Sequence, residues 1–286
     1  MRISVVIPMR NAADTIDAQL EGLASQDYSG AWEVIVADNG SRDGSAQLAA
    51  AWADRLPELR VIDASERRGV SYARNAALRA ARGDVIACCD ADDVVQPGWL
   101  SSIALAIPKW DLVGGPINWT RLSRAKMILP RPKQQSGLRG DFGFLPFALG
   151  CNCGMRTEVV RELGGWNEDY IDGGEDAELG WRAQIAGHTL GFAEGAVVLR
   201  RQRATLRGLA RQFFDYGRAQ PRLYKQFRGY GMARTPWYTI ATRWLLLAGC
   251  VWALLLPSPL ARRWVRIAGM CAGRVAGSIQ NRVLFL

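Results

Sequence analysis

Short apolar runs and helical spacings follow one another along the first third of the chain. Apolar runs without internal alternation are typical of strands buried on both faces of a parallel sheet. Such runs occupy residues 3–7, 32–37, 59–62 and 85–89. Between them, apolar residues recur at helical spacing from residue 10 onward, over 46–55 and over 69–81. This alternation predicts a right-handed βαβ series and an α/β fold with a mainly parallel sheet.

Three carboxylates follow the fourth apolar run. Asp90, Asp92 and Asp93 come directly after it. Parallel sheets bind ligands at the carboxyl ends of their strands, and a period of two puts Asp90 and Asp92 on the same side. Two such oxygen ligands can hold a divalent cation, which in turn can hold a diphosphate. A helix N-cap with a solvated turn is the alternative, and the density of carboxylates favours the metal site.

The middle of the chain has weaker patterns. Helices are expected over 97–107, 157–163 and 173–186, and strands over 111–115 and 196–199. Residues 119–143 are basic, rich in Pro and Gly and without periodicity, which predicts a long functional loop. Glu175 and Asp176 lie at the start of the helix at 173–186.

The composition is that of a globular protein, either one large α/β domain or a domain with an appendage. We expect no signal peptide, because the first apolar run ends at Pro8 and polar residues follow. Six cysteines without such a signal indicate a reduced, cytosolic setting rather than a disulfide framework. The single histidine, His188, speaks against a His-based zinc site and a Ser-His-Asp triad.

Charge is unevenly distributed along the chain. Residues 200–286 contain 16 Lys or Arg and one acid, Asp215, a net charge of +15 within a total of +9. The remainder, 1–199, therefore carries −6. An acidic first part joined to a basic tail indicates a nucleic-acid or membrane-surface partner for the tail.

The tail contains an apolar segment at 237–256 that Arg243 interrupts. Its uncharged part, 244–256, is shorter than the roughly 20 residues of a spanning helix, and basic residues flank both sides. This favours a helix or hairpin lying in the interface of an anionic membrane. A helix buried against the rest of the chain or a second copy, and a single tilted span, remain alternatives. The spacing of apolar and basic residues over 203–218 predicts another basic amphipathic helix.

Five motifs in order resemble family 2 glycosyltransferases of the GT-A fold. They are VVIPMRN at 5–11, VIVADNGSRDGS at 34–45, GVSYARN at 69–75, DADD at 90–93, and the blocks LGGWNE and GEDAELGWR within 163–182. The resemblance covers residues 1–203. It implies a nucleotide-sugar-binding α/β sandwich and inverting transfer of a sugar from a nucleotide-diphosphate sugar. We expect a nucleotide-sugar-binding half at 1–115, an acceptor and catalytic half at 116–203, and a helical region at 204–286.

The resemblance implies a set of donor-binding residues. These are Pro8, Arg10, Asn11, Asp38, Arg68, Arg74 and Asp90. Asp38 would accept a hydrogen bond from the base, although an Asx-turn explains it nearly as well. Arg68 and Arg74 would lie near the phosphates, where a guanidinium offers bidentate donors. A surface or ion-pair role is the alternative for Arg74.

The resemblance also implies the metal ligands and the base. Asp90 and Asp92 match the DxD pair, which would hold Mg²⁺ or Mn²⁺ against the diphosphate. Inversion needs a base that takes the proton of the acceptor hydroxyl. Asp176 is the expected base and Glu175 the second choice, since both match the E-D pair. Stabilisation of a helix dipole is the alternative for the two acids.

One position departs from the family pattern. Many relatives have a histidine after the strand that matches 196–199, and here Arg200, Arg201, Gln202 and Arg203 follow instead. An arginine could bind the diphosphate directly, which puts the strength of the metal requirement in doubt.

The resulting hypothesis is a metal-assisted glycosyltransferase, peripheral or monotopic on the cytoplasmic side of the plasma membrane, that extends a glycan or lipid-linked acceptor. A catalytically inactive, nucleotide-sugar-binding membrane scaffold is the alternative, which the intact DxD and E-D pairs speak against. The tail has no nucleic-acid-reading motif, so we expect no nucleic-acid partner. No G-x-G-x-x-G follows the first strand, which disfavours a dehydrogenase.

Overall fold

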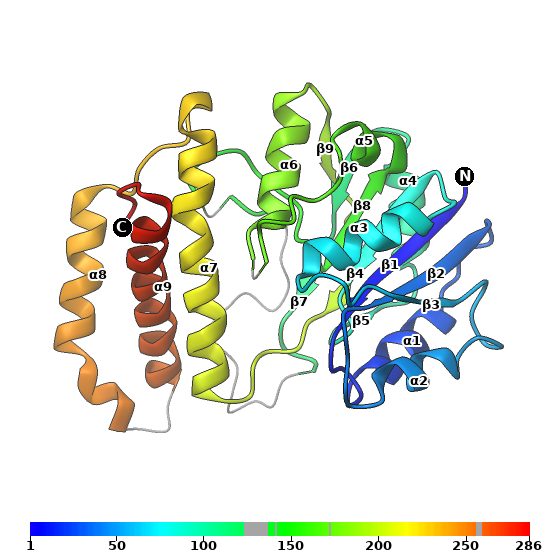
Figure 1. Cartoon of the computed structure of the whole chain (residues 1–286), viewed down its shortest axis with the longest axis horizontal. Coiled ribbons are helices and arrows are strands. Elements are labelled where there is room, and N and C mark those ends of the chain that lie inside the picture. Colours follow the sequence, from blue (N-terminus) through cyan, green and yellow to red (C-terminus); the bar gives the residue numbers. More distant parts are fainter. Residues whose placement is uncertain (123–136, 141, 172, 256–258) are drawn as a thin grey trace.

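A seven-stranded sheet forms the centre of the protein (Figure 1). The structure is a computed structural model that describes residues 1–122, 137–140, 142–171, 173–255 and 259–286. In spatial order the strands are β3 (Arg60–Asp63), β2 (Trp32–Asp38), β1 (Ile3–Met9), β4 (Val85–Cys89), β8 (Asn152–Arg156), β6 (Leu112–Gly114) and β9 (Leu190–Phe192). Within it β8 runs antiparallel to β4 and β6, and the remaining pairs are parallel. The mainly parallel sheet is therefore confirmed.

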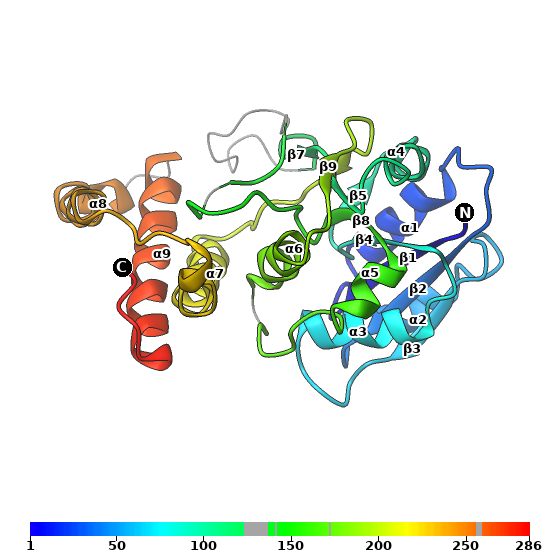
Figure 2. The ribbon, with the colours of Figure 1, turned by 90° about the horizontal axis from the view of Figure 1, so that it is seen from above.

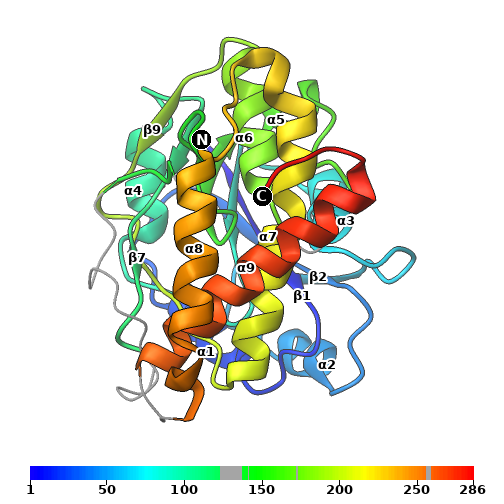
Figure 3. The same cartoon turned by 90° about the vertical axis from the view of Figure 1, so that its left-hand side faces the viewer.

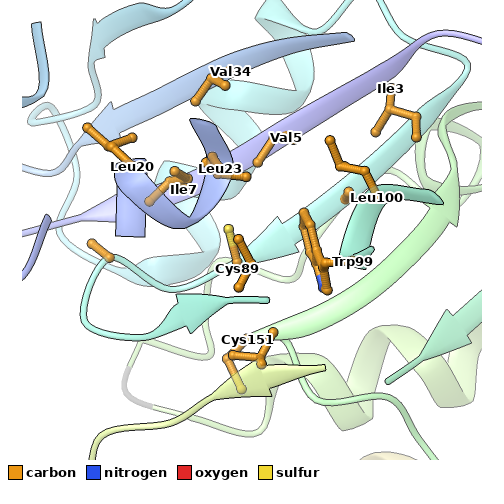
Figure 4. Close-up of a cluster of buried hydrophobic side chains, with 14 of the residues drawn as sticks. Ile3, Val5, Ile7, Leu20, Leu23, Val34, Cys89, Trp99, Leu100 and Cys151 are labelled. Atoms are coloured by element: carbon orange, nitrogen blue, oxygen red, sulfur yellow. The ribbon is translucent and has the colours of Figure 1, made fainter. Parts of the chain in front are cut away.

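Helices cover both faces of this sheet, because side chains alternate along each strand. One face packs against α1 (Ile16–Ala24), α2 (Ser45–Ala50) and α4 (Trp99–Ala106), and the other against α3 (Val70–Ala80), α5 (Thr157–Glu162) and α6 (Glu175–Ile185). Figure 4 shows the first of these cores, where Leu20 and Leu23 of α1 lie over Val5 and Ile7 of β1. Val6, between them in sequence, belongs to the opposite core.

A small second sheet lies beside the carboxyl end of β4. Its order is β5 (Val94–Val95), β10 (Val198–Leu199) and β7 (Ile117–Asn118). The antiparallel pairing of β10 with β5 brings the residues that follow Leu199 next to those that precede Val94. The arginines after β10 are therefore held against the aspartates after β4.

Three helices, α7 (Leu206–Phe227), α8 (Trp237–Gly249) and α9 (Pro259–Asn281), stand to one side of the sheet (Figure 2). α9 crosses α7 closely (Figure 3) because glycines face the contact. A Cβ added at Gly273 would lie 2.0 Å from the carbonyl oxygen of Phe214, and one at Gly277 would lie 2.4 Å from that of Arg218. Small residues thus let the two backbones approach.

The helix α8 is the outermost element of this group (Figures 1 and 3). Leu247 is its one buried residue, whereas Trp237 is 78% and Leu245 73% exposed. The alternative of a buried helix at 237–256 is therefore wrong for this chain alone, since α8 is held mainly along one edge by α9. Across the described residues, no helix combines the length and the apolar character that crossing a membrane requires.

Several predicted boundaries differ from the structure. The helix expected at 46–55 ends at Ala50 and continues as turns, and the one expected at 203–218 extends to Phe227. The apolar segment at 237–256 divides into α8 and a 3₁₀ turn at Val251–Leu255. Most of the loop expected at 119–143 lies outside the described residues, at 123–136 and 141. The strands β5, β7, β8 and β9 were not predicted, and α9 was expected only as part of a helical region at 204–286, without bounds of its own.

Candidate active site

Four side chains from separate parts of the chain meet in one cavity beside the end of β4. The cavity has a volume of about 750 Å³, and Arg74, Asp90, Glu175 and Asp176 contribute to its lining. α3 supplies Arg74, the residue after β4 is Asp90, and the first turn of α6 supplies the two other carboxylates. The predicted catalytic pair thus lies together with two of the predicted donor-binding residues.

The guanidinium of Arg74 joins these carboxylates. Its Nη1 donates to Oε1 of Glu175 at 2.8 Å, and its Nη2 donates to Oδ1 of Asp90 at 3.3 Å. The Arg74 side chain is only 2% exposed. A Cβ added at Gly150 would lie 2.7–2.9 Å from this guanidinium, so a glycine leaves room for it. An ion-pair role for Arg74, one of its two alternatives, is therefore present in the structure.

Burial shapes the charge of this group. Burial and the neighbouring Asp176 raise the pKa of Glu175 to about 7, although Arg74 opposes the shift. Burial also raises the pKa of Asp90, against the attraction of Arg74 and Arg200. Oε2 of Glu175 has no hydrogen-bond partner among the described residues. Near neutral pH the site therefore holds an acid that can gain or lose a proton.

Asp176 is less enclosed than Glu175. It is half-buried, its Oδ2 accepts a hydrogen bond from the backbone N–H of Gly150 at 3.2 Å, and its Oδ1 accepts one from the N–H of Ala177 at 2.8 Å. Both acids lie in the first turn of α6, where the helix dipole favours negative charge. The position of the two acids therefore agrees with the dipole interpretation, and it leaves a chemical role open to both.

The aspartates after β4 are held by arginines that follow β10. Nη1 of Arg203 donates to Oδ2 of Asp92 at 3.1 Å. The backbone N–H of Arg201 donates to Oδ1 of Asp93 at 3.0 Å, and Nε of Arg201 donates to the carbonyl oxygen of Asp92 at 3.3 Å. The segment that departs from the family pattern is thus in direct contact with the DxD pair.

Arg200, the first of these arginines, lies inside the site. Its Nε is 3.9 Å from Oδ2 of Asp93, and its guanidinium lies 5.4 Å from the ring centroid of Trp119. Its Nη2 donates to the hydroxyl of Tyr216 at 3.4 Å. The side chain is 18% exposed and contributes to the cavity wall. A permanent positive charge therefore stands in the segment where the resemblance implies a histidine.

Two of the three aspartates after β4, Asp90 and Asp93, fit a divalent cation, whereas Asp92, the second predicted ligand, lies outside that group and outside the lining of the cavity. Asp90, Asp93 and Cys151 offer ligand atoms within 4.8 Å of one another. Mg²⁺ and Mn²⁺ prefer oxygen ligands, and burial raises the pKa of the Cys151 thiol well above its ordinary value, so the aspartates are the better ligands. Oδ2 of Asp93 is buried without a hydrogen-bond partner among the described residues. Asp93 was not predicted as a metal ligand, although its position in the D-A-D-D motif could have indicated this role.

The residues predicted to contact the nucleoside lie at the neighbouring edge, outside the lining of the cavity. β1 and β2 end side by side, with Met9 paired to Asp38. Asp38 accepts a hydrogen bond from the N–H of Ser41 at 3.2 Å, which is the Asx-turn alternative. Asn11 has a φ of 49°, and its N–H donates to Oγ of Ser41 at 2.9 Å.

The remaining predicted donor residues divide between this edge and the surface. Pro8 is half-buried in β1, and Arg10 follows it as an exposed residue. Arg68 is exposed, and it does not contribute to the lining of the cavity. The structure therefore groups Pro8, Arg10, Asn11 and Asp38 at one edge, and it leaves Arg68 apart from Arg74.

The opposite wall of the cavity comes from the helices α7, α8 and α9. Four arginines of this wall are Arg211, Arg243, Arg266 and Arg274. Sequence reasoning had placed Arg243 in the interfacial segment and Arg266 among its flanking charges. The sequence pattern did not show that the side chains of these arginines line one cavity, because the bounds of α9 and its packing on α7 were not predicted.

This sheet, with its acidic cluster beyond the fourth strand, is the GT-A fold of glycosyltransferases. Residues 4–164 match the family model described as Glycosyl transferase family 2, and residues 85–271 match Glycosyl transferase family group 2. The chain belongs to glycosyl transferase family 2.

Two relatives illustrate the similarity in sequence. Glycosyltransferase AglE of Haloferax volcanii is 29% identical over 204 residues, which cover 68% of this chain and 65% of the relative. Succinoglycan biosynthesis protein ExoU of Rhizobium meliloti is 30% identical over 217 residues, covering 67% of this chain and 61% of the relative. The chain therefore spans less than two thirds of the length of either protein.

Solved structures share the fold at low identity. Mannosyltransferase PcManGT from Pyrobaculum calidifontis, in complex with GDP-Man and Mn²⁺, has a TM-score of 0.66 at 20% identity and covers 98% of this chain and 87% of its own. TarS of S. aureus, in complex with UDP-GlcNAc, has a TM-score of 0.57 at 17% identity, and the match covers 100% of this chain and 93% of the TarS chain.

Proposed function

We propose that the protein is a metal-assisted, inverting glycosyltransferase that moves a sugar from a nucleotide-diphosphate sugar to a glycan or lipid-linked acceptor. The observation that carries this proposal is the single cavity in which Arg74 joins Asp90 to Glu175, with Asp176 beside them. Donor ligands and a candidate base thus face one space large enough for a sugar. The complexes of the similar folds with GDP-Man and Mn²⁺ and with UDP-GlcNAc support the donor class.

The donor end of the site would lie at the carboxyl edge of β1, β2 and β4. Pro8, Arg10, Asn11 and Asp38 would line the nucleoside, and Arg74 would contact the phosphates. Asp90 and Asp92 would hold Mg²⁺ or Mn²⁺, which neutralises charge on the leaving diphosphate when bound. Arg68 would approach the phosphates only if its exposed side chain turns inward.

Arg200 would share the task of neutralising the diphosphate. Its guanidinium already faces Asp93 at 3.9 Å within the cavity wall. A permanent cation at this position stabilises negative charge without a metal. We therefore expect a weaker metal requirement than a site with a neutral histidine would have.

Asp176 would act as the base. It takes the proton from the acceptor hydroxyl while that oxygen attacks the anomeric carbon, and the bond from that carbon to the diphosphate oxygen breaks. Glu175 is the second choice, because Arg74 holds its Oε1 and burial favours its neutral form. The more open Asp176 presents its carboxyl group to the cavity.

A melting screen of nucleotide sugars with and without Mn²⁺ tests the donor class. A selective shift is expected, because a ligand that binds the folded state stabilises it by mass action. Asp176→Asn should keep that shift and lose transfer. Wild-type protein that binds a donor without transferring its sugar to any acceptor would instead support the inactive scaffold.

We also propose that α8 docks on the anionic, cytoplasmic face of the plasma membrane. Its exposed face carries Trp237, Trp244 and Leu245, and Arg234 and Arg263 are exposed nearby in the chain. Aromatic and aliphatic side chains flanked by basic ones suit the interface of an anionic bilayer. The charge of the tail favours this surface over a second copy of the chain.

Sedimentation with lipid vesicles tests the docking surface. The protein should bind phosphatidylcholine vesicles that contain phosphatidylglycerol, and the double substitution Trp244→Ser and Leu245→Ser should weaken that binding. Leu105→Ser, at an exposed leucine of α4, is the matched control. A concentration-dependent dimer that protects α8 instead of vesicle binding would contradict the proposal.

A further inference from the structure

The wall of the cavity that faces the carboxylates is strongly basic. Nine arginines and four acids contribute to the lining of the whole cavity. Three of the acids, Asp90, Glu175 and Asp176, lie at the catalytic end, and Asp215 is the acid from the helical wall. The four arginines of that wall are Arg211, Arg243, Arg266 and Arg274. An excess of cations facing an open space indicates an anionic ligand.

These arginines have few partners in the part of the chain that the structure describes. Nη1 of Arg243 is buried and makes no hydrogen bond there. Burial, together with the neighbouring Arg243, lowers the pKa of Arg274 to about 10. Burial also lowers the pKa of Arg266, and Arg263 adds to that effect. Buried cations without a counter-charge are costly, so an anion bound between them would relieve an existing strain.

Arg274 is the most buried member of this group. It is 7% exposed, its Nε donates to Oε1 of Gln220 at 2.6 Å, and its Nη1 donates to Oγ1 of Thr235 at 3.3 Å. Arg266 lies with its guanidinium 5.8 Å from the ring centroid of Phe213. Neutral contacts therefore orient two of these cations, and no salt bridge to either is present between described residues.

Apolar side chains share this wall with the arginines. Leu209 and Phe213 of α7 and Ile267 and Met270 of α9 contribute to the same lining. An acidic polysaccharide has no apolar chain to place against such side chains, whereas a lipid that ends in a phosphate does. The exposed residues Trp244 and Leu245 of α8 follow Arg243 directly in sequence.

We infer that the wall formed by α7, α8 and α9 binds the phosphate of a membrane-derived lipid phosphate, which is the acceptor or the carrier of the acceptor. The inference rests on the proposed function, because it names the acceptor class of that same cavity. The arginines hold the phosphate group, and the apolar residues contact the first part of the lipid chain. The head of this lipid then lies in the cavity that Asp176 also lines.

Titration calorimetry of the full chain with farnesyl phosphate tests this site. Farnesyl phosphate should bind, whereas farnesol and inorganic phosphate should bind much more weakly, since each offers only half of the contacts. Arg243→Gln and Arg266→Gln should each weaken the binding at least about tenfold, because each removes a charge-assisted contact. Arg228→Gln, at an exposed arginine after the end of α7 that does not line the cavity, is the matched control and should change nothing.

Donor binding is measured in the same proteins to separate this inference from the proposed function. Binding of the nucleotide sugar should be equal in wild type and in all three variants. A protein that binds the donor but not farnesyl phosphate, or that binds trigalacturonate through the same arginines instead, overturns the lipid-phosphate site. A protein that binds farnesyl phosphate through them but no donor keeps the site and refutes the glycosyltransferase proposal.

Discussion

The guanidinium of Arg74 donates a 2.8 Å hydrogen bond to Glu175, a residue 101 positions away in the chain. The contact ties α3 to α6, which belong to the halves expected to bind the nucleotide sugar and the acceptor. The same guanidinium reaches Asp90 at the end of β4. One buried cation therefore joins the end of β4 to the first turn of α6, which also carries Asp176.

Replacing this cation should destabilise the fold. Arg74→Met would leave the buried carboxylates Glu175 and Asp90 without their shared counter-charge, and breaking a buried pair in this way costs roughly 3 kcal/mol. Urea unfolding measures the change in the free energy of unfolding. Arg79→Met, at an exposed position of the same helix, should change it by less than about 0.5 kcal/mol. Equal effects of the two substitutions would contradict the bridging role of Arg74.

Displacing the cation without removing it should lower activity. In Gly150→Ala the new Cβ would approach the Arg74 guanidinium to 2.7–2.9 Å, so the guanidinium must move. We expect kcat to fall at least about tenfold, since small misplacements in an active site are costly. Gly229→Ala, where a new Cβ meets nothing within 4 Å, is the control. Unchanged transfer by Gly150→Ala would show that the position of Arg74 is not critical.

The raised pKa of Glu175 should appear as a pH dependence of stability. Its pKa of about 7 in the folded protein exceeds the ordinary value of 4.5, so the folded state binds an extra proton between these pH values. The contribution of Glu175 to the free energy of unfolding therefore falls as the pH rises from about 4.5 to about 7. Urea unfolding at several pH values should show this slope in wild type, and Glu175→Gln should reduce it, since Asp90 also has a raised pKa. Parallel curves for the two proteins would refute the assignment.

Removing the ion pair between Arg203 and Asp92 should raise the affinity of the site for the metal. Arg203 pairs with Asp92 at 3.1 Å, and both side chains are partly exposed, at 52% and 32%. In Arg203→Gln the carboxylate loses a competing cation, so the affinity for Mn²⁺ should rise about two- to fivefold, in keeping with an exposed ion pair. Arg207→Gln, at the exposed start of α7, should leave it unchanged. A weaker affinity for Mn²⁺ in Arg203→Gln would contradict competition at Asp92.

The sequence pattern predicted those strands and helices whose own residues form an apolar run or an apolar stripe. The runs of β1, β2 and β4 are apolar and end at turn residues, so both the parallel sheet and its carboxyl edge could be located. The strand β8 could not be predicted, because Asn152–Arg156 contains a buried asparagine and a glycine and lacks an apolar run. Its burial depends on neighbours, since the Asn152 side chain bonds to Trp99 and to Pro116.

The bounds of the helix α9 were not predicted, because this helix also lacks a clear apolar pattern. Its contact with α7 is made by glycines such as Gly273 and Gly277, which a search for apolar stripes does not register. The basic wall of the cavity depends on this contact, so it also could not be foreseen. Asp90, Glu175 and Asp176 were predicted because each lies in a short motif, whereas the bridge through Arg74 needs distant segments to meet.

Anomalous scattering from a crystal grown with a nucleotide-diphosphate sugar and Mn²⁺ tests the central claim most directly. We predict one manganese peak about 2 Å from carboxylate oxygens of Asp90 and Asp92, with the diphosphate on its far side and the sugar toward Asp176. A donor bound elsewhere, or manganese that contacts neither aspartate while the donor fills the cavity, would contradict it.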